Sequence, residues 1–429
     1  MPARSLRIAW LGPAPGEDGG VPGVARDLLH GLAERGHRID CFLPSGGQRI
    51  ATQLAENPSI AFVWGTSQWQ WDRWYSRTKI AAFASGMIAR GLASVRLRRL
   101  IEDGHAREPY DVVYQFSSIE SPAVPPRLTR TVPLVIHPET HSAGELRSLI
   151  CERRLSLRCQ SPARFASVIA IMLARSLMQR VRIRRARLLV CISGVFRDHM
   201  VNDYGFPVGD TVVVPNPVRL ERFRPSDRPL GEPPVVLVLG RVVARKGVES
   251  VVAVAKLLRD RDVPVRIRIV GGPSLWSDYT KLLDDLPAET AEYVGPLPSS
   301  EIPAELAASD LLLQASRYEP FALTVAEALA AGVPVVGTSE VGAIESVDST
   351  VAAEVAPGDA QAMATAIVAM LERVRIAPAE TRATARAEAE RLFAPDVVCD
   401  AISAALERLV GGAEDDGSGR TATPTDAAR

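Results

Sequence analysis

Short apolar runs alternate with stretches of helical period along the first half of the chain. Val24, Leu28, Leu29 and Leu32 recur at helical spacing between two apolar runs, and Gly36 is a typical helix stop. This alternation of strand and helix predicts a parallel, doubly wound sheet. The strands expected here are residues 6–11, 39–43, 111–114, 133–136 and 188–192, and the region 12–23 is expected to be a Gly- and Pro-rich loop before a helix over 24–35.

The second half repeats this alternation after a linker, residues 214–234, that contains six prolines. Proline disfavours both a helix interior and a central strand, so we expect a domain boundary near residue 215. Strands are expected at 235–239, 265–270, 311–314 and 333–337, and helices at 248–259, 324–331, 359–375 and roughly 379–410. The small, polar sequence from Gly411 onwards predicts a disordered tail, 411–429.

Composition places the chain among soluble globular proteins, with 429 residues, 47% of them hydrophobic. Five cysteines without metal-ligand spacing predict a reducing compartment and no zinc site. The N-terminus does not resemble a signal peptide, because Arg7 interrupts its apolar run, and no run approaches the ~20 apolar residues of a membrane span. These features predict a cytoplasmic protein.

The balanced total charge hides a polarity between the two halves. Residues 1–215 hold 28 Lys and Arg against 18 Asp and Glu, whereas residues 216–429 hold 22 against 32. Much of the surplus lies in 145–187, with eleven arginines against two glutamates, and a second unusual segment, 64–99, combines four tryptophans with Arg-rich sequence. Both segments predict basic helical insertions. Either they contact an anionic membrane surface from the cytoplasmic side, or they form a solvated face over the sheet. Nucleic-acid binding is not expected, since no recognition module accompanies the charge.

Two basic residues follow the first strand of the second half. Arg241 comes directly after Gly240, and Lys246 precedes a helix. In open α/β sheets, ligands bind beyond the carboxyl ends of the strands, so both cations are placed where a phosphate would lie. An arginine fork and a lysine suit a diphosphate whose charge grows as a bond breaks. A solvated basic loop is the alternative.

Two glutamates frame the start of the helix expected at 324–331. Glu319 lies in the loop before it, where the amides of a first helical turn are free to hold an anionic group, and Glu327 lies inside the apolar helix. A carboxylate in such surroundings suits sugar or ribose hydroxyls as donors. The alternative is a dipole partner for the helix and a partly buried structural glutamate.

Taken in order, these motifs resemble glycosyltransferase family 4. Seven residues separate Glu319 from Glu327, as in that family's paired glutamates. The other matching strings are ISG at 192–194, VPNPV at 214–218, FRP at 223–225, GR at 240–241, KG at 246–247, VGGP at 270–273 and AGVPVV at 331–336. The resemblance covers most of residues 1–410 and is specific because the motifs occur jointly.

The resemblance implies a GT-B fold, with two Rossmann-like domains facing each other across a cleft. The expected divisions are an acceptor-binding domain (1–214), a nucleotide-sugar-binding domain (215–395) and a helix (396–410) that crosses back to the first domain. It further implies a retaining, metal-independent glycosyltransferase that needs no cofactor and takes a nucleotide-diphosphate sugar as donor. Its product would be a polysaccharide, glycolipid or other glycoconjugate, made on a glycan, lipid-linked or small-molecule acceptor.

The resemblance also assigns roles to particular residues. Arg241 and Lys246 would contact the donor diphosphate, Glu327 the ribose, and Glu319 the transferred sugar. His137 would stand beside that sugar at the end of its strand. The remaining donor-binding residues act through the backbone and are Gly19, Gly20, Gly272, Phe321, Ala322 and Leu323.

The chain departs from the family pattern at three places. Pro22-Gly23 follows the Gly19-Gly20 loop, Tyr114 to Ser117 replaces the usual histidine after the preceding strand, and Val341 replaces the first glycine of a Gly-Gly-x-x-Glu motif that retains Glu345. Two other classes stay open. One is a non-catalytic binding protein on the same fold, and the other is a dinucleotide-dependent oxidoreductase, although the loop at 12–16 lacks the G-x-G-x-x-G fingerprint.

Overall fold

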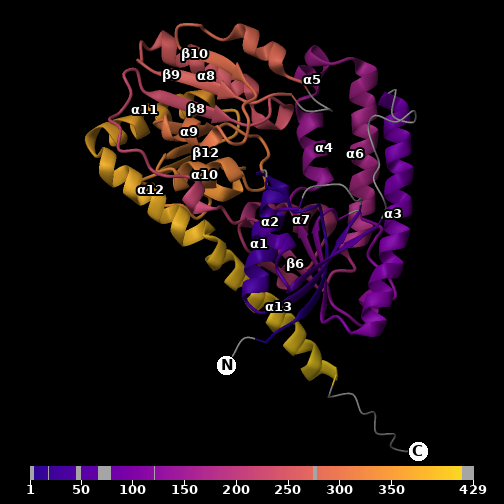
Figure 1. Cartoon of the computed structure of the whole chain (residues 1–429). Helices are drawn as coiled ribbons and strands as arrows, with labels where there is room; N and C mark the ends of the chain where they lie inside the picture. Colours follow the sequence, from indigo (N-terminus) through magenta and orange to yellow (C-terminus); the bar gives the residue numbers. More distant parts are fainter. Residues whose placement is uncertain are drawn as a thin grey trace, which may run out of the picture.

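The computed structural model contains two α/β domains, each built on one parallel sheet (Figure 1). It describes residues 4–17, 19–44, 50–65, 79–119, 121–273 and 278–417, and for residues 79–91 and 413–417 it describes the backbone only. The predicted fold class, two doubly wound parallel sheets, is confirmed. Among the described residues, no helix is long and apolar enough to cross a bilayer.

The N-terminal domain carries a seven-stranded sheet in the order β3-β2-β1-β4-β5-β6-β7. Its neighbouring strands pair in parallel, so their carboxyl ends meet at one edge. The strands are β1 Arg7–Leu11, β2 Arg38–Leu43, β3 Ile60–Trp64, β4 Val112–Ser117, β5 Leu134–Pro138, β6 Leu188–Cys191 and β7 Thr211–Val213; the helices are α1 Val21–Glu34, α2 Thr52–Ala55, α3 Lys79–Arg107, α4 Ser142–Cys151, α5 Arg153–Cys159, α6 Pro162–Ile183 and α7 Gly194–Tyr204.

The C-terminal domain carries a six-stranded parallel sheet in the order β10-β9-β8-β11-β12-β13. Its two central strands are apolar apart from Gln314 and are largely buried, as expected where helices cover both faces. The strands are β8 Val235–Leu239, β9 Arg266–Val270, β10 Ala291–Gly295, β11 Leu311–Gln314, β12 Val335–Thr338 and β13 Ala352–Val355; the helices are α8 Val248–Asp260, α9 Ile302–Ala307, α10 Leu323–Ala330, α11 Ala360–Ile376, α12 Pro378–Phe393 and α13 Pro395–Gly417.

Three details differ from the sequence predictions. Helix α1 begins at Val21 rather than 24, because Gly20 (φ 75°) takes the cap position and Pro22 fits the first turn. Residues 411–417 continue α13, so the tail predicted to be disordered from 411 is helical to Gly417, and 418–429 lie outside the described residues. The strands β3, β7, β10 and β13 were not predicted, and all four are the edge strands of their sheets.

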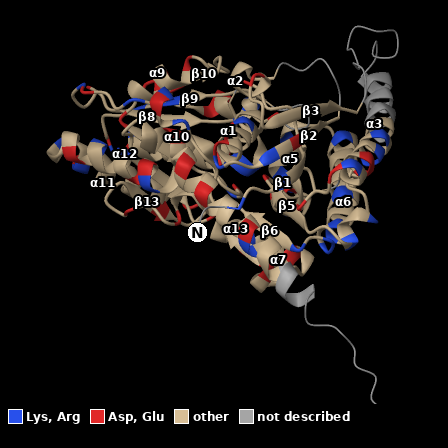
Figure 2. Ribbon diagram, turned by 60° about the horizontal axis from the view of Figure 1, so that its bottom comes forward, with Lys and Arg blue, Asp and Glu red and all other residues tan. Residues whose placement is uncertain are grey.

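The two basic segments form helices in the N-terminal domain. Residues 145–187 fold into α4, α5 and α6, while 64–99 spans the end of β3 and much of α3. The tryptophans at 69, 71 and 74 lie outside the described residues. Figures 1 and 2 show α3 and α6 running side by side along one flank of the molecule. Arg98 of α3 and Arg182 of α6 both donate to the intervening loop, at the carbonyls of Pro122 and Ser121.

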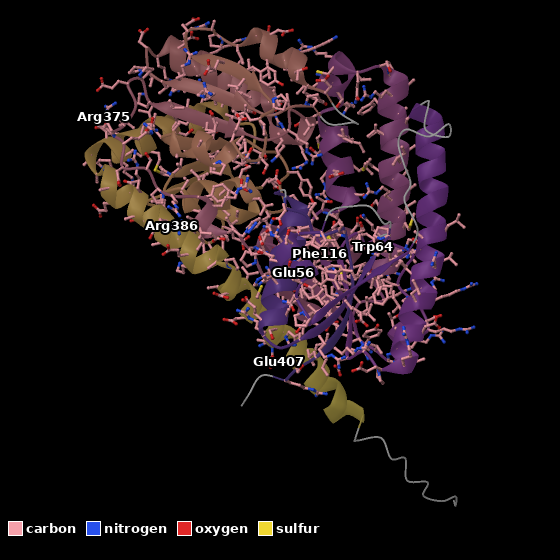
Figure 3. The ribbon with its side chains drawn as sticks, viewed as in Figure 1. Glu56, Trp64, Phe116, Arg375, Arg386 and Glu407 are labelled. Atoms are coloured by element: carbon pink, nitrogen blue, oxygen red, sulfur yellow. The ribbon has the colours of Figure 1, made fainter. Side chains whose placement is uncertain are left out.

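The C-terminal helices tie the two domains together. Arg386 of α12, labelled in Figure 3, donates to three carbonyls, those of Leu220 and Phe223 in the linker and of Ala330 at the end of α10. Beyond it, α13 packs against α1, where Cys399 and Leu406 are fully buried. The chain therefore returns to its first domain after completing its second.

The insertion helices make a second connection between the domains. Leu149, Leu155 and Cys159 of α4 and α5 pack against the hydrophobic core of the C-terminal domain. Arg317, which follows β11, forms ion pairs of 2.6 Å with Glu152 between α4 and α5 and with Glu249 of α8. Part of the 145–187 segment thus covers the partner domain rather than facing only solvent.

Candidate functional site

A hollow lies at the carboxyl ends of β8, β9 and β11 in the C-terminal domain. Gly240, Arg241 and Lys246 line it on one side, and Gln314 and Ala315 on another. The predicted basic pair therefore lies at the strand ends where ligands bind in doubly wound sheets.

Glycines allow the backbone segments around this hollow to approach closely. Gly271 has φ 145°, and a Cβ there would lie 1.8 Å from the carbonyl oxygen of Gly240. Gly247 is left-handed (φ 63°) at the cap of α8, and a Cβ there would lie 2.0 Å from the carbonyl oxygen of Ala315. Gly272, another predicted donor residue, accepts a 2.8 Å hydrogen bond from the amide of Val242 and so lies beside the same loop.

Glu319 is shared by two neighbouring cations. It forms ion pairs with Arg245 (2.6 Å) and with Lys246, and only 8% of it is exposed. Burial alone would raise the pKa of Glu319, but the charges of Arg245 and Lys246 outweigh burial and lower its pKa to about 2. Burial lowers the pKa of Lys246, and the nearby arginines add to that effect while Glu319 opposes it. The predicted Lys246 and Glu319 are thus brought into direct contact.

Arg241 is exposed, and its side chain forms no ion pair or hydrogen bond with any described residue. It lies near Lys246, whose pKa it helps to lower. An anion would bind favourably here, because it can pair with both Arg241 and Lys246. Arg241 would break no existing contact to do so, and the charge of Lys246 is only partly neutralised by Glu319.

The loop before α10 holds its backbone in a strained form. Ala322 caps α10 with φ 82° and ψ 81°, a left-handed conformation that costs an alanine about 1 kcal/mol. The carbonyls of Glu319 and Phe321 accept from the amides of Gly342 and Ala343, which fixes the loop against the next segment. The amides of Phe321 and Ala322 have no acceptor among the described residues. They are therefore available to a ligand, as is the start of α10 at Leu323.

A second hollow lies between the two domains. Gly19, Gly20 and the start of α1 line it from the N-terminal domain, and Leu323 and Glu327 of α10 from the C-terminal domain. Burial raises the pKa of Glu327 to about 7, and the nearby Arg222 opposes the rise. Helix α10 also contacts the first hollow, since Thr324 donates a long (3.4 Å) hydrogen bond to Gln314 there.

His137 lies in the interior of the N-terminal sheet rather than on an open wall. Its side chain is fully buried, and its Nδ1 lies 2.7 Å from the Tyr114 hydroxyl. Burial lowers the pKa of His137 to about 3, and its Nε2 has no partner among the described residues. Phe116, labelled in Figure 3, stacks edge-on against the ring at 5.1 Å.

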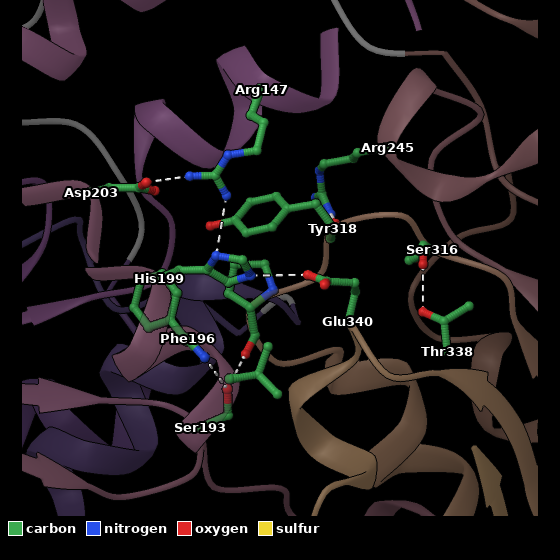
Figure 4. A network of polar contacts seen from close by, with 12 residues as sticks. Arg147, Ser193, Phe196, His199, Asp203, Arg245, Ser316, Tyr318, Thr338 and Glu340 are labelled. Atoms are coloured by element: carbon green, nitrogen blue, oxygen red, sulfur yellow. Dashed lines mark hydrogen bonds and ion pairs between the residues drawn. The ribbon is translucent and has the colours of Figure 1, made fainter. Parts of the chain in front are cut away.

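Polar contacts join the domains next to this site (Figure 4). The hydroxyl of Ser193 accepts from the amide of Phe196, capping α7, and donates to the carbonyl of Pro320 in the other domain at 2.7 Å. His199 of α7 lies 2.9 Å from Glu340. Glu345 also crosses the boundary, accepting from the amide of Val195 at the start of α7.

Two family models match the chain, one in each of its two domains. A model described as "Glycosyltransferase Family 4" matches residues 18–222, and one described as "Glycosyl transferases group 1" matches residues 233–373. Together they cover both domains and the candidate site. The chain belongs to glycosyltransferase family 4. The predicted resemblance is confirmed.

Curated relatives share just under a third of the matched residues. A glycogen synthase of Mycobacterium tuberculosis is 29% identical over 217 residues, which is 49% of this chain and 50% of that protein. A GDP-mannose-dependent α-(1-6)-phosphatidylinositol monomannoside mannosyltransferase of the same species is 29% identical over 41% of this chain and 49% of its own length. The chain spans about half the length of these curated relatives.

Solved structures share the GT-B fold of this family 4 chain. A sucrose-phosphate synthase from Thermosynechococcus elongatus superimposes with a TM-score of 0.68 at 18% identity, covering 95% of this chain and all of the other. HepE from Anabaena, solved with UDP and glucose, has a TM-score of 0.60 at 19% identity and covers 94% and 99%. Similarity at this level shows the fold.

Sequence reasoning missed several residues of the site. Arg245, the second partner of Glu319, belongs to no periodic pattern in the sequence. Its position beside Lys246 could have marked it as a further residue of the site. Arg222 follows the linker motif and was not singled out. Tyr114 was recorded only as a departure from the family histidine, yet it is the hydrogen-bond partner of His137.

The Glu319 contact predicts a specific acid sensitivity. The pKa of Glu319 is lowered in the folded state from 4.5 to about 2. Its contribution to the free energy of unfolding is therefore complete above pH 4.5 and is lost as the pH falls towards 2. At pH 6, Glu319→Gln is expected to reduce the free energy of unfolding by about 3 kcal/mol. Urea unfolding of both proteins between pH 6 and 3 measures this difference, which should shrink on acidification. Glu301→Gln, at an exposed position of the same domain, is the control; equal effects of the two changes would contradict the assignment.

Proposed function

We propose that the chain is a retaining, metal-independent glycosyltransferase that moves a sugar from a nucleotide-diphosphate sugar to an acceptor hydroxyl. The observation that carries this proposal is the unpaired Arg241 beside the Lys246–Glu319 pair at the carboxyl end of β8. The names of similar proteins support the donor class, since HepE was solved with UDP-glucose and the mannosyltransferase is GDP-mannose-dependent.

In this proposal the donor lies across the two hollows of the candidate site. The diphosphate pairs with Arg241 and Lys246, the backbone at Gly19 and Gly20 faces it from the other domain, and Gly272 lies beside the same loop. The ribose hydroxyls donate to Glu327. The amides of Phe321 and Ala322 and the start of α10 at Leu323 hold the sugar, with Glu319 and His137 as its further neighbours. The unit 215–395 thus binds the donor, and 1–214 the acceptor, with 396–410 joining them.

The chemistry proposed is charge stabilisation and positioning. The bond between the sugar's anomeric carbon and the diphosphate oxygen breaks, and the negative charge that develops on the diphosphate is stabilised by Arg241, Lys246 and the amides before α10. The acceptor oxygen forms the new bond from the same face, and its proton passes to the departing diphosphate. Configuration at the anomeric carbon is therefore retained. The acceptor is a glycan, a lipid-linked sugar or a small molecule, in the synthesis of a polysaccharide or other glycoconjugate.

Replacing Arg241 tests the proposal with little risk to folding, because its side chain has no described partner to lose. Arg241→Ala is expected to weaken binding of UDP or GDP, whichever the wild-type chain binds, by about 10- to 100-fold, as loss of a charge-assisted contact predicts. Lys246→Met should act in the same direction. Calorimetric titration measures the affinities, and Arg259→Ala, an exposed arginine of α8, serves as the control. Unchanged affinity and turnover in both site variants would refute the proposal.

Glu327 predicts a pH dependence of donor binding. Its carboxyl has a pKa of about 7 and must be ionised to accept hydrogen bonds from both ribose hydroxyls. Affinity for the nucleotide is therefore expected to rise with pH up to about 7, by up to about tenfold per unit below that value, and then to level off. Glu327→Gln should remove this dependence while leaving the effect of Arg241→Ala intact. A wild-type affinity that is flat between pH 5.5 and 8, or a dependence that survives in Glu327→Gln, would contradict this role.

We also propose that the flank formed by α3 and α6 contacts an anionic membrane surface. Along α6, Leu173, Leu177 and Val181 are 49%, 57% and 64% exposed, and Leu92 of α3 is 64% exposed. Exposed arginines continue the α6 stripe at 180, 184 and 185, and Figure 2 shows the basic residues gathered on these helices. Apolar side chains beside arginines are the pattern of an interfacial helix on anionic lipid. Such a contact would bring the acceptor domain to a lipid-linked acceptor on the inner face of the membrane.

Vesicle flotation tests this surface. The chain should float with vesicles that contain phosphatidylglycerol at low salt, and much less with pure phosphatidylcholine. Leu177→Glu combined with Val181→Glu should reduce the bound fraction at least tenfold, because it places two charges in the interface. Val208→Glu changes a similarly exposed residue (61%) away from these helices and should leave binding unchanged. Failure of the wild-type chain to bind anionic vesicles would leave α6 as a solvated face.

A further inference from the structure

His137 and Tyr114 form a buried polar pair in a largely apolar layer, where the indole nitrogen of Trp10 also has no partner among the described residues. They lie on the neighbouring strands β5 and β4, with the Tyr114 hydroxyl 2.7 Å from Nδ1 of His137, and both side chains are fully buried. Trp10 stacks on the Tyr114 ring at 4.7 Å, and Phe116 covers the imidazole from the side. The nearest ionisable neighbour along the chain is Glu139, whose Oε2 accepts from Asn216.

The position of the imidazole proton follows from counting donors and acceptors. If Nδ1 carried the proton, the phenolic hydrogen and the Nε2 lone pair would both lack a partner among the described residues. If Tyr114 donates to Nδ1 instead, only the Nε2 hydrogen remains without one. Each buried donor or acceptor without a partner is destabilising, so the arrangement that leaves only one such group is favoured.

We propose that Tyr114 is a positioning residue that donates its phenolic hydrogen to Nδ1 of His137 and thereby holds the imidazole neutral, with its proton on Nε2 for an oxygen of the transferred sugar. This inference rests on the proposed function and adds the hydrogen-bonding role of His137 within it. The unpartnered Nε2 is the observation that points to a ligand, because a buried N–H is rarely left without an acceptor.

Protonation equilibria agree with this geometry. Burial lowers the pKa of His137 to about 3 and raises the pKa of Tyr114 well above its ordinary value, so neither group changes charge near neutral pH. Burial raises the pKa of Glu139 to about 7, opposed by the Asn216 hydrogen bond. His137 therefore donates a hydrogen bond to the sugar and does not carry a proton between substrate and solvent. Tyr114, which sets the tautomer of His137, belongs to the segment where the family usually has another histidine.

Nitrogen NMR of the full chain labelled with ¹⁵N-histidine reads the tautomer directly. The chain has six histidines, and the His137 signals are identified by their loss in His137→Gln. The wild-type protein is expected to show a protonated Nε2 and a bare Nδ1 at every pH from 5 to 9. Tyr114→Phe should populate the other tautomer as well. Tyr110→Phe removes a second buried hydroxyl, one that donates to Asp40, and should leave the His137 signals unchanged.

Binding measurements supply the second readout. Tyr114→Phe should weaken binding of the nucleotide sugar about tenfold but leave the affinity for the free nucleotide diphosphate, which lacks the sugar, unchanged. His137→Gln, whose amide can replace Nε2–H, should retain more of the sugar-dependent affinity than His137→Asn, whose amide replaces Nδ1. This pair keeps the test decisive should Tyr114→Phe not fold.

A protonated Nδ1 in the wild-type chain, a titration of His137 between pH 5 and 9, or equal sugar-dependent affinities of the Gln and Asn variants would overturn the inference. The NMR measurement uses the protein without bound nucleotide sugar. Its outcome therefore tests the tautomer independently of nucleotide binding. Loss of the Arg241 effect would instead refute the proposed function.

Discussion

Glu319 lies buried between Arg245 and Lys246, and this contact holds together the two loops that form the candidate donor site. One loop follows β8 and leads into α8, and the other follows β11 and leads into α10. A buried carboxylate between two cations leaves a net positive charge, which Arg241 increases at the mouth of the hollow. The site therefore keeps a carboxylate for structural order and still offers positive charge to a diphosphate.

The connection between the domains depends on groups that serve both at once. The Ser193 hydroxyl caps α7 in one domain and donates to the carbonyl of Pro320 in the other. Arg386 donates hydrogen bonds to carbonyls of both the linker and α10. Pro320 belongs to the loop before α10, so the Ser193 contact ties that loop to the start of α7 in the other domain. The proposed sugar transfer would require both halves, since it must bring a donor and an acceptor together.

The sequence alone predicted most of the fold because its central strands are continuous apolar runs and its helices have clear periodic faces. Residues 235–239 and 311–314 were placed correctly for this reason. Short strands at or near the sheet edges, such as β7 and β13, were missed, because they are stabilised by pairing with a neighbour rather than by their own composition.

For the candidate site, sequence motifs identified the backbone positions better than the side-chain partners. Arg241 and Lys246 were placed at the correct strand end, because that position follows from topology. The pairing of Glu319 with Arg245, and of His137 with Tyr114, depends on contacts between separate strands and loops, which no local pattern encodes. The burial of His137 likewise follows from its neighbours on β1 and β4 rather than from its own strand.

Helices α4 and α5 have a consequence for how the molecule can be divided. Leu149, Leu155 and Cys159 belong in sequence to the first domain, yet they complete the apolar interior of the second, and α13 makes the reverse exchange on α1. A cut at the proline-rich linker would therefore not release two self-sufficient halves. Each half would expose to water the apolar surface that the other normally covers. The two domains are therefore expected to fold as one unit.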